Sequence, residues 1–187
     1  MKADFFCSAY RANQIPQRKE PKILIIGRSN VGKSSLINHL FQNSTLARVS
    51  KKPGKTVSLN FYFVNNRLLL VDLPGYGFAK KARSSKEAWG PFIEGFVEDQ
   101  QEEIILMLFL VDSRRELSAE DLTFLNWIKI KKIPLLLIFT KCDKVKPSLT
   151  VKNKIQKELS SLWQGCIEYS IKQDQGRQSL LSYLKQL

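Results

Sequence analysis

Three short polar segments each stand directly after an apolar run and carry residue types that can do chemistry. The first, residues 27–34 (GRSNVGKS), follows the apolar residues 22–26 and ends in a Lys-Ser pair. This spacing is typical of a phosphate-binding loop between a strand and a helix. Backbone N–H groups would surround a β-phosphate, Lys33 would contact the β- and γ-phosphates, and Ser34 would bind Mg²⁺. For this segment alone, a glycine-rich turn with a chance lysine is the structural alternative.

The second segment is Asp72-Leu-Pro-Gly75, which follows the apolar residues 68–71 and lies 39 residues after Lys33. Asp72 would hold the metal through water and the Gly75 N–H would contact the γ-phosphate, so the order of this loop would depend on a triphosphate. Taken alone, the four residues are equally typical of a turn. Their position at the end of an expected strand favours the switch interpretation.

The third segment is Thr140-Lys-Cys-Asp143, which follows the apolar residues 135–139. The Asp143 carboxylate can accept two hydrogen bonds from the N1–H and exocyclic amine of guanine, and adenine does not present these donors together. Lys141 can lie along the base. An exposed charged turn is the alternative for this segment alone, but the three segments in this order predict a site for a guanine nucleotide and Mg²⁺.

The sequence between these segments alternates between strand and helix patterns. Expected strands cover residues 22–26, 57–64, 67–71, 104–111, 135–139 and 167–169, and expected helices cover residues 33–41, 92–100, 149–163, 179–187 and a segment starting at Ser118. Asn65-Asn66 indicates a hairpin, which adds one antiparallel strand. The pattern predicts an α/β fold with a doubly wound, mostly parallel sheet and helices on both faces, as in Ras-like P-loop NTPases. In such sheets ligands bind beyond the carboxyl ends of the strands, where all three segments fall.

The domain organisation expected from the sequence is simple. Residues 1–21 show no sustained periodicity and end in a stretch rich in proline and charge, which indicates an N-terminal arm. The remaining residues, 22–187, fit one GTP-binding domain. Residues 43–56 are polar and basic and are expected to form a long mobile loop.

Charge is the unusual feature of the composition. The chain carries a net charge of +13, with +9 in residues 1–60, −3 in residues 61–120 and +7 in residues 121–187. Such an excess favours a polyanionic partner, either nucleic acid or an anionic membrane surface. No apolar run reaches the roughly 20 residues of a membrane span, and no leader is visible, so we expect no integral membrane segment and a cytoplasmic location. Cys7, Cys142 and Cys166 are expected to be reduced thiols that fill space.

Several segments together resemble the EngB (YsxC, YihA) family of GTPases. They are residues 27–38, Pro53-Gly-Lys-Thr56, residues 72–80 and residues 140–143, and the resemblance extends from about Phe6 onward. Thr140, where most GTPases have Asn, and the segment 76–80 (YGFAK) are typical of that family. The resemblance implies a bacterial cytosolic GTPase that assists large ribosomal subunit assembly and is linked to cell division and septation.

The resemblance also implies roles for single residues. Thr56 is the expected second side-chain ligand of Mg²⁺, after Ser34 and with Asp72, and residues 54–58 are the expected loop over the phosphates. Ser170 and Ile171 are expected in the last base-contacting loop, with the Ile171 side chain directed away. The expected catalytic residues are Lys33, Asn30 and Thr56. The expected nucleotide-contacting residues are Gly27, Arg28, Ser29, Asn30, Val31, Gly32, Lys33, Ser34, Ser35, Gly54, Lys55, Thr56, Val57, Ser58, Asp72, Leu73, Pro74, Gly75, Thr140, Lys141, Cys142, Asp143, Tyr169, Ser170 and Ile171.

Turnover is expected to be slow in the isolated protein. Tyr76 stands where many small GTPases have the Gln that orients the attacking water. Asn30 matches the Asn of GTPases that use K⁺ to neutralise developing charge, with a purely loop-stabilising Asn as the alternative. A second source of acceleration is a partner such as rRNA. It would be bound by a basic patch of Lys80, Lys81, Arg83 and Lys86, with Phe78 and Trp89 interleaved. A plain solvated loop is the alternative interpretation of these residues.

Two other classes of protein share some of these features. A metabolic P-loop kinase would share residues 27–34 but has no use for residues 140–143. A GTP-regulated binding module at a membrane or septal surface would suit the charge equally well. The sequence favours a monomeric GTPase with GTP or GDP and the large ribosomal subunit, or its precursor, as partners.

Overall fold

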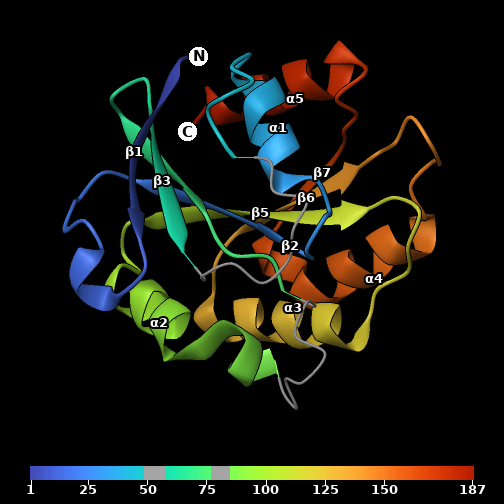
Figure 1. Cartoon of the computed structure of the whole chain (residues 1–187). Helices are drawn as coiled ribbons and strands as arrows, with labels where there is room; N and C mark the ends of the chain where they lie inside the picture. Colours follow the sequence, from blue (N-terminus) through green and yellow to red (C-terminus); the bar gives the residue numbers. More distant parts are fainter. Residues whose placement is uncertain (49–57, 77–84) are drawn as a thin grey trace.

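A seven-stranded sheet forms the centre of the protein in the computed structural model, which describes residues 1–48, 58–76 and 85–187, with side chains from residue 91 in the last range. The strand order is β1-β3-β4-β2-β5-β6-β7. Figure 1 shows the sheet crossing the centre of the molecule between the helices. The strands are β1 (Ala3–Ala9), β2 (Lys22–Gly27), β3 (Leu59–Val64), β4 (Leu68–Asp72), β5 (Ile104–Asp112), β6 (Leu135–Thr140) and β7 (Trp163–Glu168). The helices are α1 (Lys33–Leu40), α2 (Ser85–Asp99), α3 (Ala119–Lys131), α4 (Leu149–Leu159) and α5 (Asp174–Leu184), with short 3-10 turns η1 (Ala12–Gln14) and η2 (Ser160–Leu162).

Strand direction agrees with the mostly parallel sheet that the sequence predicts. β2 pairs in parallel with β4 and β5, and β6 pairs in parallel with β5 and β7. β3 is antiparallel to both of its neighbours, β1 and β4, so among the described strands it alone runs against the others. The predicted hairpin joins β3 to β4 through Asn65 and Asn66, whose φ angles of 49° and 53° are those of a tight two-residue turn.

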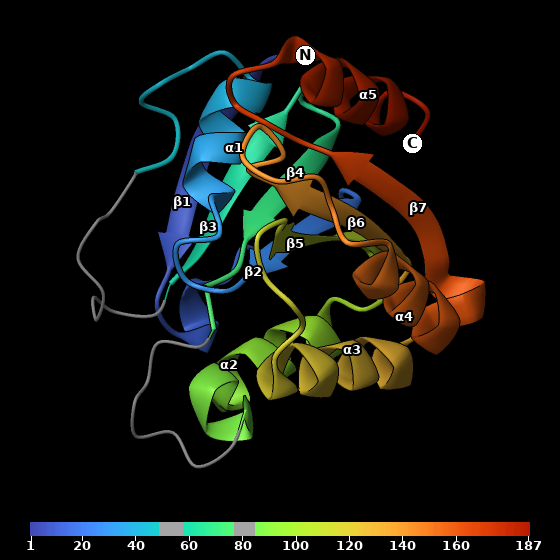
Figure 2. The same cartoon turned by 90° about the vertical axis from the view of Figure 1, so that its right-hand side faces the viewer.

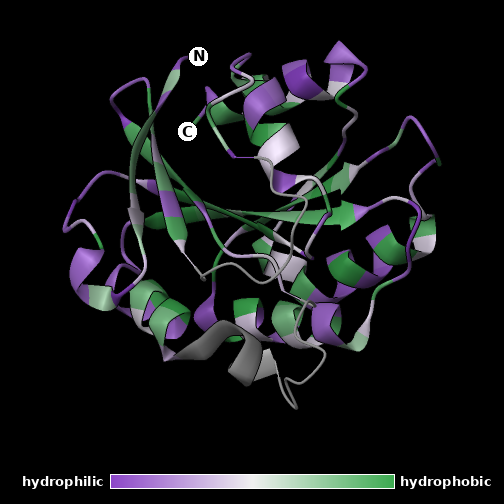
Figure 3. Ribbon diagram, in the orientation of Figure 1, coloured by the Kyte–Doolittle hydropathy of each residue, from purple (hydrophilic) through white to green (hydrophobic). Residues whose placement is uncertain are grey.

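Helices cover both faces of the sheet, as predicted. Figure 2 shows α1 and α5 on one face and α2, α3 and α4 on the other. Two hydrophobic clusters follow from this arrangement, one between the sheet and α2, α3 and α4, the other between the sheet and α1 and α5. Central strands are apolar along their length because both of their faces are covered (Figure 3).

The N-terminal segment differs from the expected arm. Residues 3–9 form β1, an edge strand that pairs with β3 from Ala3 opposite Val64 to Ala9 opposite Leu59. A register shift between Phe5 and Cys7 interrupts the alternation of buried and exposed side chains, and three consecutive residues, 4–6, are exposed. The first strand of the sheet is therefore β1 and not residues 22–26, and the bulge is the reason that the sequence shows no sustained alternation there.

The C-terminal elements also have different boundaries from those expected. α4 ends at Leu159 because Ser160 adopts a positive φ of 33°, and β7 begins at Trp163, earlier than the expected strand at residues 167–169. α5 begins at Asp174, earlier than the expected helix at residues 179–187. Its first four residues, DQGR, are polar and show no helical apolar spacing, so the sequence did not indicate this start. The helix start predicted at Ser118 is confirmed, since Ser118 and Asp121 form a capping box.

Part of the expected loop at residues 43–56 is described. The side chain of Asn38 on α1 exchanges two hydrogen bonds with the backbone of Ala47, at 2.9 and 2.7 Å. This part of the expected loop is thus hydrogen-bonded to α1. Gly54, Lys55, Thr56, Val57, Phe78, Lys80, Lys81 and Arg83 lie outside the described residues, as do the side chains of Lys86 and Trp89.

Within the described segments, no helix has the length and hydropathy needed to cross a membrane.

Candidate functional site

The phosphate loop connects β2 to α1 and has the conformation that its glycines allow. Gly32 has a φ of 110° and caps α1 without a side-chain hydrogen bond, so the first N–H groups of the helix remain available to an anion. Gly27 packs so closely that a β-carbon would lie 2.7 Å from the Leu110 carbonyl oxygen. Asn30 also has a positive φ, 63°, a conformation that Asn tolerates better than most residues. The local structure is therefore that of an anion-binding loop.

Residues 75 and 76 lie against this loop. The Ser29 N–H donates a 2.9 Å hydrogen bond to the Tyr76 carbonyl oxygen, and Arg28 and Tyr76 form an isolated parallel bridge. A β-carbon on Gly75 would lie 3.1 Å from the Lys33 ammonium nitrogen. The segment expected to contact a γ-phosphate thus meets the lysine expected to bind it.

The Tyr76 side chain points away from this meeting point and into the protein. Its ring stacks on Phe124 of α3 with 5.7 Å between centroids, and its hydroxyl donates a 2.5 Å hydrogen bond to Asp121 Oδ1. Only 3% of Tyr76 is exposed. Burial, together with the charge of Asp121, raises the pKa of the Tyr76 hydroxyl far above its usual value. Tyr76 therefore contributes its backbone, and not its side chain, to the site.

Asp72 is suited to a metal ion. It is the last residue of β4 and is 8% exposed, and its Oδ1 lies 3.9 Å from the Lys33 ammonium nitrogen. In the described part of the chain, Oδ1 is buried and has no hydrogen-bond partner. Burial raises the pKa of Asp72, while the Lys33 charge and a hydrogen bond from Asn60 oppose the rise. A buried carboxylate oxygen without a donor matches the oxygen ligands that Mg²⁺ prefers.

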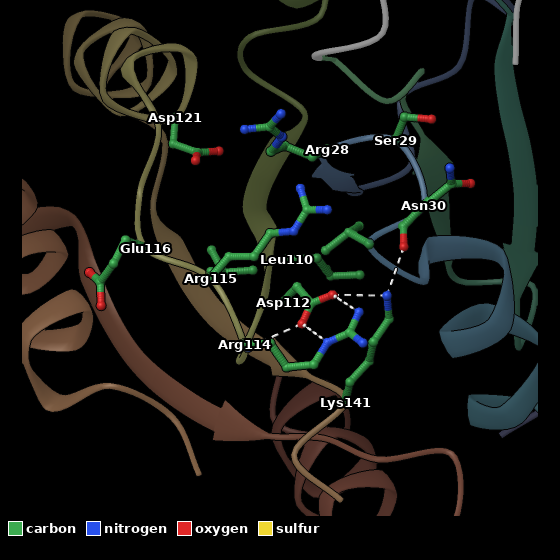
Figure 4. A pocket seen from close by; sticks show the side chains of 12 residues that line it. Arg28, Ser29, Asn30, Leu110, Asp112, Arg114, Arg115, Glu116, Asp121 and Lys141 are labelled. Carbon is green, nitrogen blue, oxygen red and sulfur yellow. Dashed lines mark hydrogen bonds and ion pairs between the residues drawn. The ribbon is translucent and has the colours of Figure 1, made fainter. Parts of the chain in front are cut away.

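Lys141 fastens the base-binding segment to the phosphate loop. Its ammonium nitrogen donates 2.9 Å hydrogen bonds to the Asn30 carbonyl oxygen and to Asp112 Oδ2, and Figure 4 shows it between the two. Thr140 is buried, with 4% of the residue exposed, and its hydroxyl donates a 2.8 Å hydrogen bond to the Val31 carbonyl oxygen. Two neighbouring side chains thus hold the phosphate loop and the third segment in fixed relation.

Asp143 and the loop after β7 come together at the adjacent edge of the site. The Ser170 hydroxyl donates a 2.9 Å hydrogen bond to Asp143 Oδ1, and the Lys172 ammonium lies 3.6 Å from Oδ2. The Ser170 hydrogen bond is the main cause that holds the pKa of Asp143 below its usual value. Ile171 is 54% exposed, in line with a side chain directed away from a bound base. The Asp143 carboxylate is thus kept ionised as a hydrogen-bond acceptor.

Several groups that support this site were not predicted from the sequence. Asp112 binds both Lys141 and Arg114, Asp121 holds the Tyr76 hydroxyl, and Asn60 adjoins Asp72. Asp112 ends the apolar strand β5, and the rule that ligand sites lie at carboxyl ends of strands could have found it. Asp121 and Asn60 carry no such signal, because their partners are distant in the sequence.

A small charged cavity of about 140 Å³ lies beside the phosphate loop (Figure 4). Residues 28–31 of that loop form one side, and the end of β5 with residues 114–116 forms another. Of the expected nucleotide-contacting residues, Arg28, Ser29, Asn30, Val31 and Lys141 line it, whereas Lys33, Asp72 and Asp143 do not. The cavity therefore overlaps the expected nucleotide site only at residues 28–31 and Lys141.

The fold and the arrangement of these segments at the carboxyl ends of β2, β4, β6 and β7 define a P-loop GTP-binding protein. A family model described as "50S ribosome-binding GTPase" matches residues 22–141. A "Probable GTP-binding protein EngB" of Thermoanaerobacter pseudethanolicus is 45% identical over 145 residues, covering 78% of this chain and 75% of the relative. The protein of that name from Chlorobaculum tepidum is 39% identical over 183 residues, 96% of this chain and 94% of the relative.

Solved structures agree with this assignment. A crystal structure of an EngB protein has a TM-score of 0.66 and 26% identity and covers 88% of this chain and 97% of its own. Era from Aquifex aeolicus with bound GDP and AlF₄⁻ has a TM-score of 0.65 and 24% identity, covers 89% of this chain and 56% of its own, and shares the fold. The chain belongs to the EngB family of GTP-binding proteins, and it is a GTPase.

Proposed function

We propose that this GTPase is a nucleotide-dependent assembly factor for the large ribosomal subunit. The observation that carries the proposal is the match of residues 22–141 to the ribosome-binding GTPase model in a chain with a net charge of +13. The proposal places the protein in the bacterial cytoplasm, where ribosomes assemble, as a monomer. The link to cell division and septation that the family resemblance implies would then be a consequence of ribosome assembly.

The site residues have distinct tasks in this proposal. The phosphate loop, residues 27–35, holds the β-phosphate through backbone N–H groups, and Lys33 contacts the β- and γ-phosphates. Ser34, Thr56 and Asp72 would hold Mg²⁺, which neutralises charge on the phosphates when it is bound. Asp72 Oδ1, which is buried and has no hydrogen-bond partner among the described residues, supports this assignment. Residues 54–58 would close over the phosphates.

Guanine recognition depends on Asp143. Its carboxylate accepts hydrogen bonds from the N1–H and exocyclic amine of the base, and Ser170 holds it in place at 2.9 Å. Lys141 would lie along the base, and the contacts of Lys141 to Asn30 and Asp112 fix its position. The backbone N–H of Ile171 would meet the guanine O6. A P-loop kinase has no use for this arrangement.

Hydrolysis by the isolated protein would be slow, since the inward-facing Tyr76 leaves no side chain at that position to orient water. Two sources of acceleration fit the chain. K⁺ at Asn30 would neutralise charge that develops on the phosphates. A ribosomal partner would bind the basic residues Lys80, Lys81 and Arg83, which follow Gly75 in the sequence.

The test measures binding to purified large-subunit precursors across a salt series, with a GTP analogue, with GDP and without nucleotide. We expect GTP to tighten binding, and we expect affinity to fall steeply with salt because phosphates of rRNA supply much of it. The triple variant Lys80→Ala, Lys81→Ala, Arg83→Ala should reduce the logarithmic salt slope by roughly one unit for each lost phosphate contact, with nucleotide affinity nearly unchanged.

A matched variant with Lys152, Lys154 and Lys157 of α4 replaced by Ala removes the same charge from another part of the chain. If only this variant flattens the slope, the RNA contact lies on α4. Binding that is indifferent to nucleotide would refute the switch.

A membrane or septal surface is the second candidate function, because the same positive charge attracts anionic lipid. Co-sedimentation with vesicles of phosphatidylglycerol, in parallel with ribosomal subunits, separates the two functions. Tighter, GTP-dependent binding to the vesicles would favour the membrane function.

A further inference from the structure

The edge strand β1 reaches the expected metal site through one side chain. The Ser8 hydroxyl donates a 2.7 Å hydrogen bond to Asn60 Oδ1, across the pairing of β1 with β3. Ser8 and Asn60 are directly opposite in the antiparallel register, and both are partly buried. Because Oδ1 of Asn60 is occupied as an acceptor, the amide nitrogen of Asn60 is left to donate elsewhere.

Asn60 is also directly opposite Asp72, in the pairing of β3 with β4. Directly opposite residues project from the same face of a sheet, with their β-carbons about 5 Å apart. The Asn60 amide lowers the pKa of Asp72, against the rise that burial causes, so the two side chains interact. Asp72 Oδ1 has no hydrogen-bond partner among the described residues and lies 3.9 Å from the Lys33 ammonium nitrogen, which leaves Oδ2 as the oxygen available to the Asn60 amide.

The three residues therefore form a row across three adjacent strands: Ser8 on β1, Asn60 on β3 and Asp72 on β4. The Ser8 hydroxyl holds the Asn60 amide in one orientation. The Asn60 amide in turn is directly opposite the Asp72 carboxylate, whose Oδ1 lies near Lys33 of the phosphate loop.

We propose that Asn60 is a positioning residue for the metal-binding carboxylate of Asp72, and that Ser8 orients Asn60 for this task. The proposal rests on the assignment of Asp72 to Mg²⁺ under the proposed function. A hydrogen bond to the carboxylate oxygen turned away from the metal holds the carboxylate in one rotation and reduces the entropy lost on metal binding, whether the carboxylate holds the metal directly or through water. Partners of this kind commonly change metal affinity by 10- to 100-fold. The N-terminal strand thus contributes to Mg²⁺ binding although it contains no expected ligand.

The experiment measures the affinity of a fluorescent, non-hydrolysable GTP analogue in saturating Mg²⁺ and in EDTA. The ratio of the two dissociation constants is the Mg²⁺ enhancement. Asn60→Ala should reduce this enhancement about tenfold, while affinity in EDTA stays within about twofold. Ser8→Ala should reduce it roughly threefold, because it removes one hydrogen bond, and Ser8→Thr should restore it because the hydroxyl is kept.

Asn65→Gly is the matched control. Asn65 Oδ1 accepts a 2.8 Å hydrogen bond from the Lys2 N–H, so this variant also removes one contact between the N-terminal segment and the β3–β4 hairpin, but at the end remote from Asp72. Glycine keeps the positive φ of this position. The unfolding temperature should fall about as much as in Ser8→Ala, with an unchanged Mg²⁺ enhancement.

Asp72→Asn separates this proposal from the one on which it rests. If Asp72→Asn retains the full Mg²⁺ enhancement, the metal assignment itself fails. If Asp72→Asn loses the enhancement while Asn60→Ala and Ser8→Ala keep it, or lose affinity equally in Mg²⁺ and in EDTA, Asn60 has a structural role only and the inference is overturned. Should Asn60→Ala not fold, the Ser8→Ala and Ser8→Thr pair decides alone.

Discussion

The backbone N–H of Ser29 in the phosphate loop donates its hydrogen bond to the carbonyl oxygen of Tyr76, at 2.9 Å. Gly75 also packs against the phosphate loop, since a β-carbon at this position would lie 3.0 Å from the Ser29 nitrogen and 3.1 Å from the Lys33 ammonium nitrogen. Ser29 and Lys33 are groups that we expect to contact a triphosphate. If Ser29 contacts a triphosphate as we expect, the γ-phosphate and the Tyr76 carbonyl would compete for the Ser29 N–H.

This competition predicts a nucleotide-dependent change at one amide. In the GDP form the Ser29 N–H should keep its bond to Tyr76, and a GTP analogue should break that bond. The amide resonance of Ser29 should therefore differ between the two forms in NMR spectra of ¹⁵N-labelled protein. The Leu36 amide, which donates to the Gly32 carbonyl oxygen at 2.8 Å within α1, is the control and should differ little. Equal Ser29 shifts in both forms would contradict the competition.

The Tyr76 hydroxyl should matter for stability and not for catalysis. Tyr76→Phe keeps the ring on Phe124 but leaves Asp121 Oδ1 without this donor. We expect the free energy of unfolding to fall by about 1–3 kcal/mol, the usual cost of a buried polar group left without its partner. The rate of GTP hydrolysis should stay within about twofold, because the hydroxyl is directed to α3 and not to the phosphate loop. Urea unfolding and single-turnover hydrolysis measure the two quantities, and a hydrolysis rate lowered tenfold or more would give the hydroxyl a catalytic role.

Most of the fold was predictable because its signals are local. Apolar runs at residues 104–111 and 135–139 became β5 and β6, and the Asn65-Asn66 turn and the Ser118 capping box formed as expected. β1 was missed because its bulge interrupts the alternation that marks a strand. The start of α5 was missed because its first turn, DQGR, is polar and contains Gly176, which packs too closely against the Glu168 carbonyl oxygen for any side chain.

The candidate site was predictable where a motif is contiguous in the sequence. Residues 27–35, 72–75 and 140–143 meet at one edge of the sheet, as parallel topology requires. The residues that hold them were not predictable, because their partners come from other strands. Lys141 depends on Asp112, 29 residues earlier, and Tyr76 depends on Asp121, 45 residues later. Only the register of the sheet and the packing of α3 bring these pairs together.

Asp112 should stabilise the fold in a pH-dependent manner. Burial alone would raise the pKa of Asp112, but hydrogen bonds from Arg114 and Lys141 outweigh it and hold the pKa well below the usual range. A carboxyl whose pKa is lower in the folded state stabilises the fold above its unfolded pKa of about 4, and this stabilisation is lost as the pH falls toward the folded value. Asp112→Asn should therefore cost about 1–3 kcal/mol at pH 7, and the difference from the unaltered protein should shrink below about pH 4.

Urea unfolding at several pH values checks this expectation. Arg114→Ala is the control, since the Arg114 side chain is 46% exposed and its removal leaves the Lys141 contact to Asp112 intact. It should lower the free energy of unfolding at pH 7 less than Asp112→Asn does, because an exposed charge contributes little. A difference for Asp112→Asn that stays constant from pH 7 to pH 3 would show that charge is not the cause.

The Asp143 carboxylate should determine the choice of base. Asp143→Asn keeps the size of the side chain but replaces an acceptor of two guanine donors by an amide, so GTP affinity should fall by at least about 100-fold, the value of one or two hydrogen bonds to a charged group. Xanthosine triphosphate should bind this variant better than GTP does, because xanthine has a carbonyl oxygen where guanine has its exocyclic amine, and the Asn amide can donate a hydrogen bond to that oxygen. Ser170→Ala removes the 2.9 Å hydrogen bond from the Ser170 hydroxyl to Asp143 but leaves the carboxylate in place. This variant should lower GTP affinity roughly fivefold without a change in base preference. Unchanged GTP affinity in Asp143→Asn would place base recognition elsewhere.

Potassium should accelerate hydrolysis through Asn30. The Asn30 carbonyl oxygen is committed to Lys141, whereas its side-chain amide points away from Lys141 and the residue is exposed (Figure 4). An exposed amide oxygen beside the expected phosphate site would be a suitable K⁺ ligand. Because the Tyr76 side chain faces inward and cannot orient water, we expect hydrolysis to depend on such help. We expect GTP hydrolysis to be roughly tenfold faster in potassium than in sodium at equal ionic strength.

Two variants separate the potassium role from loop stabilisation. Asn30→Ala removes the amide and also strains the backbone, because φ is 63° at this position. Asn30→Gly removes the same amide but accepts that φ without strain. If Asn30 binds K⁺, both variants lose the difference between potassium and sodium, and GTP affinity survives better in Asn30→Gly. If Asn30 only stabilises the loop, Asn30→Gly keeps whatever salt preference the unaltered protein has. Equal rates in the two salts for the unaltered protein would remove potassium from the mechanism and leave a ribosomal partner as the source of acceleration.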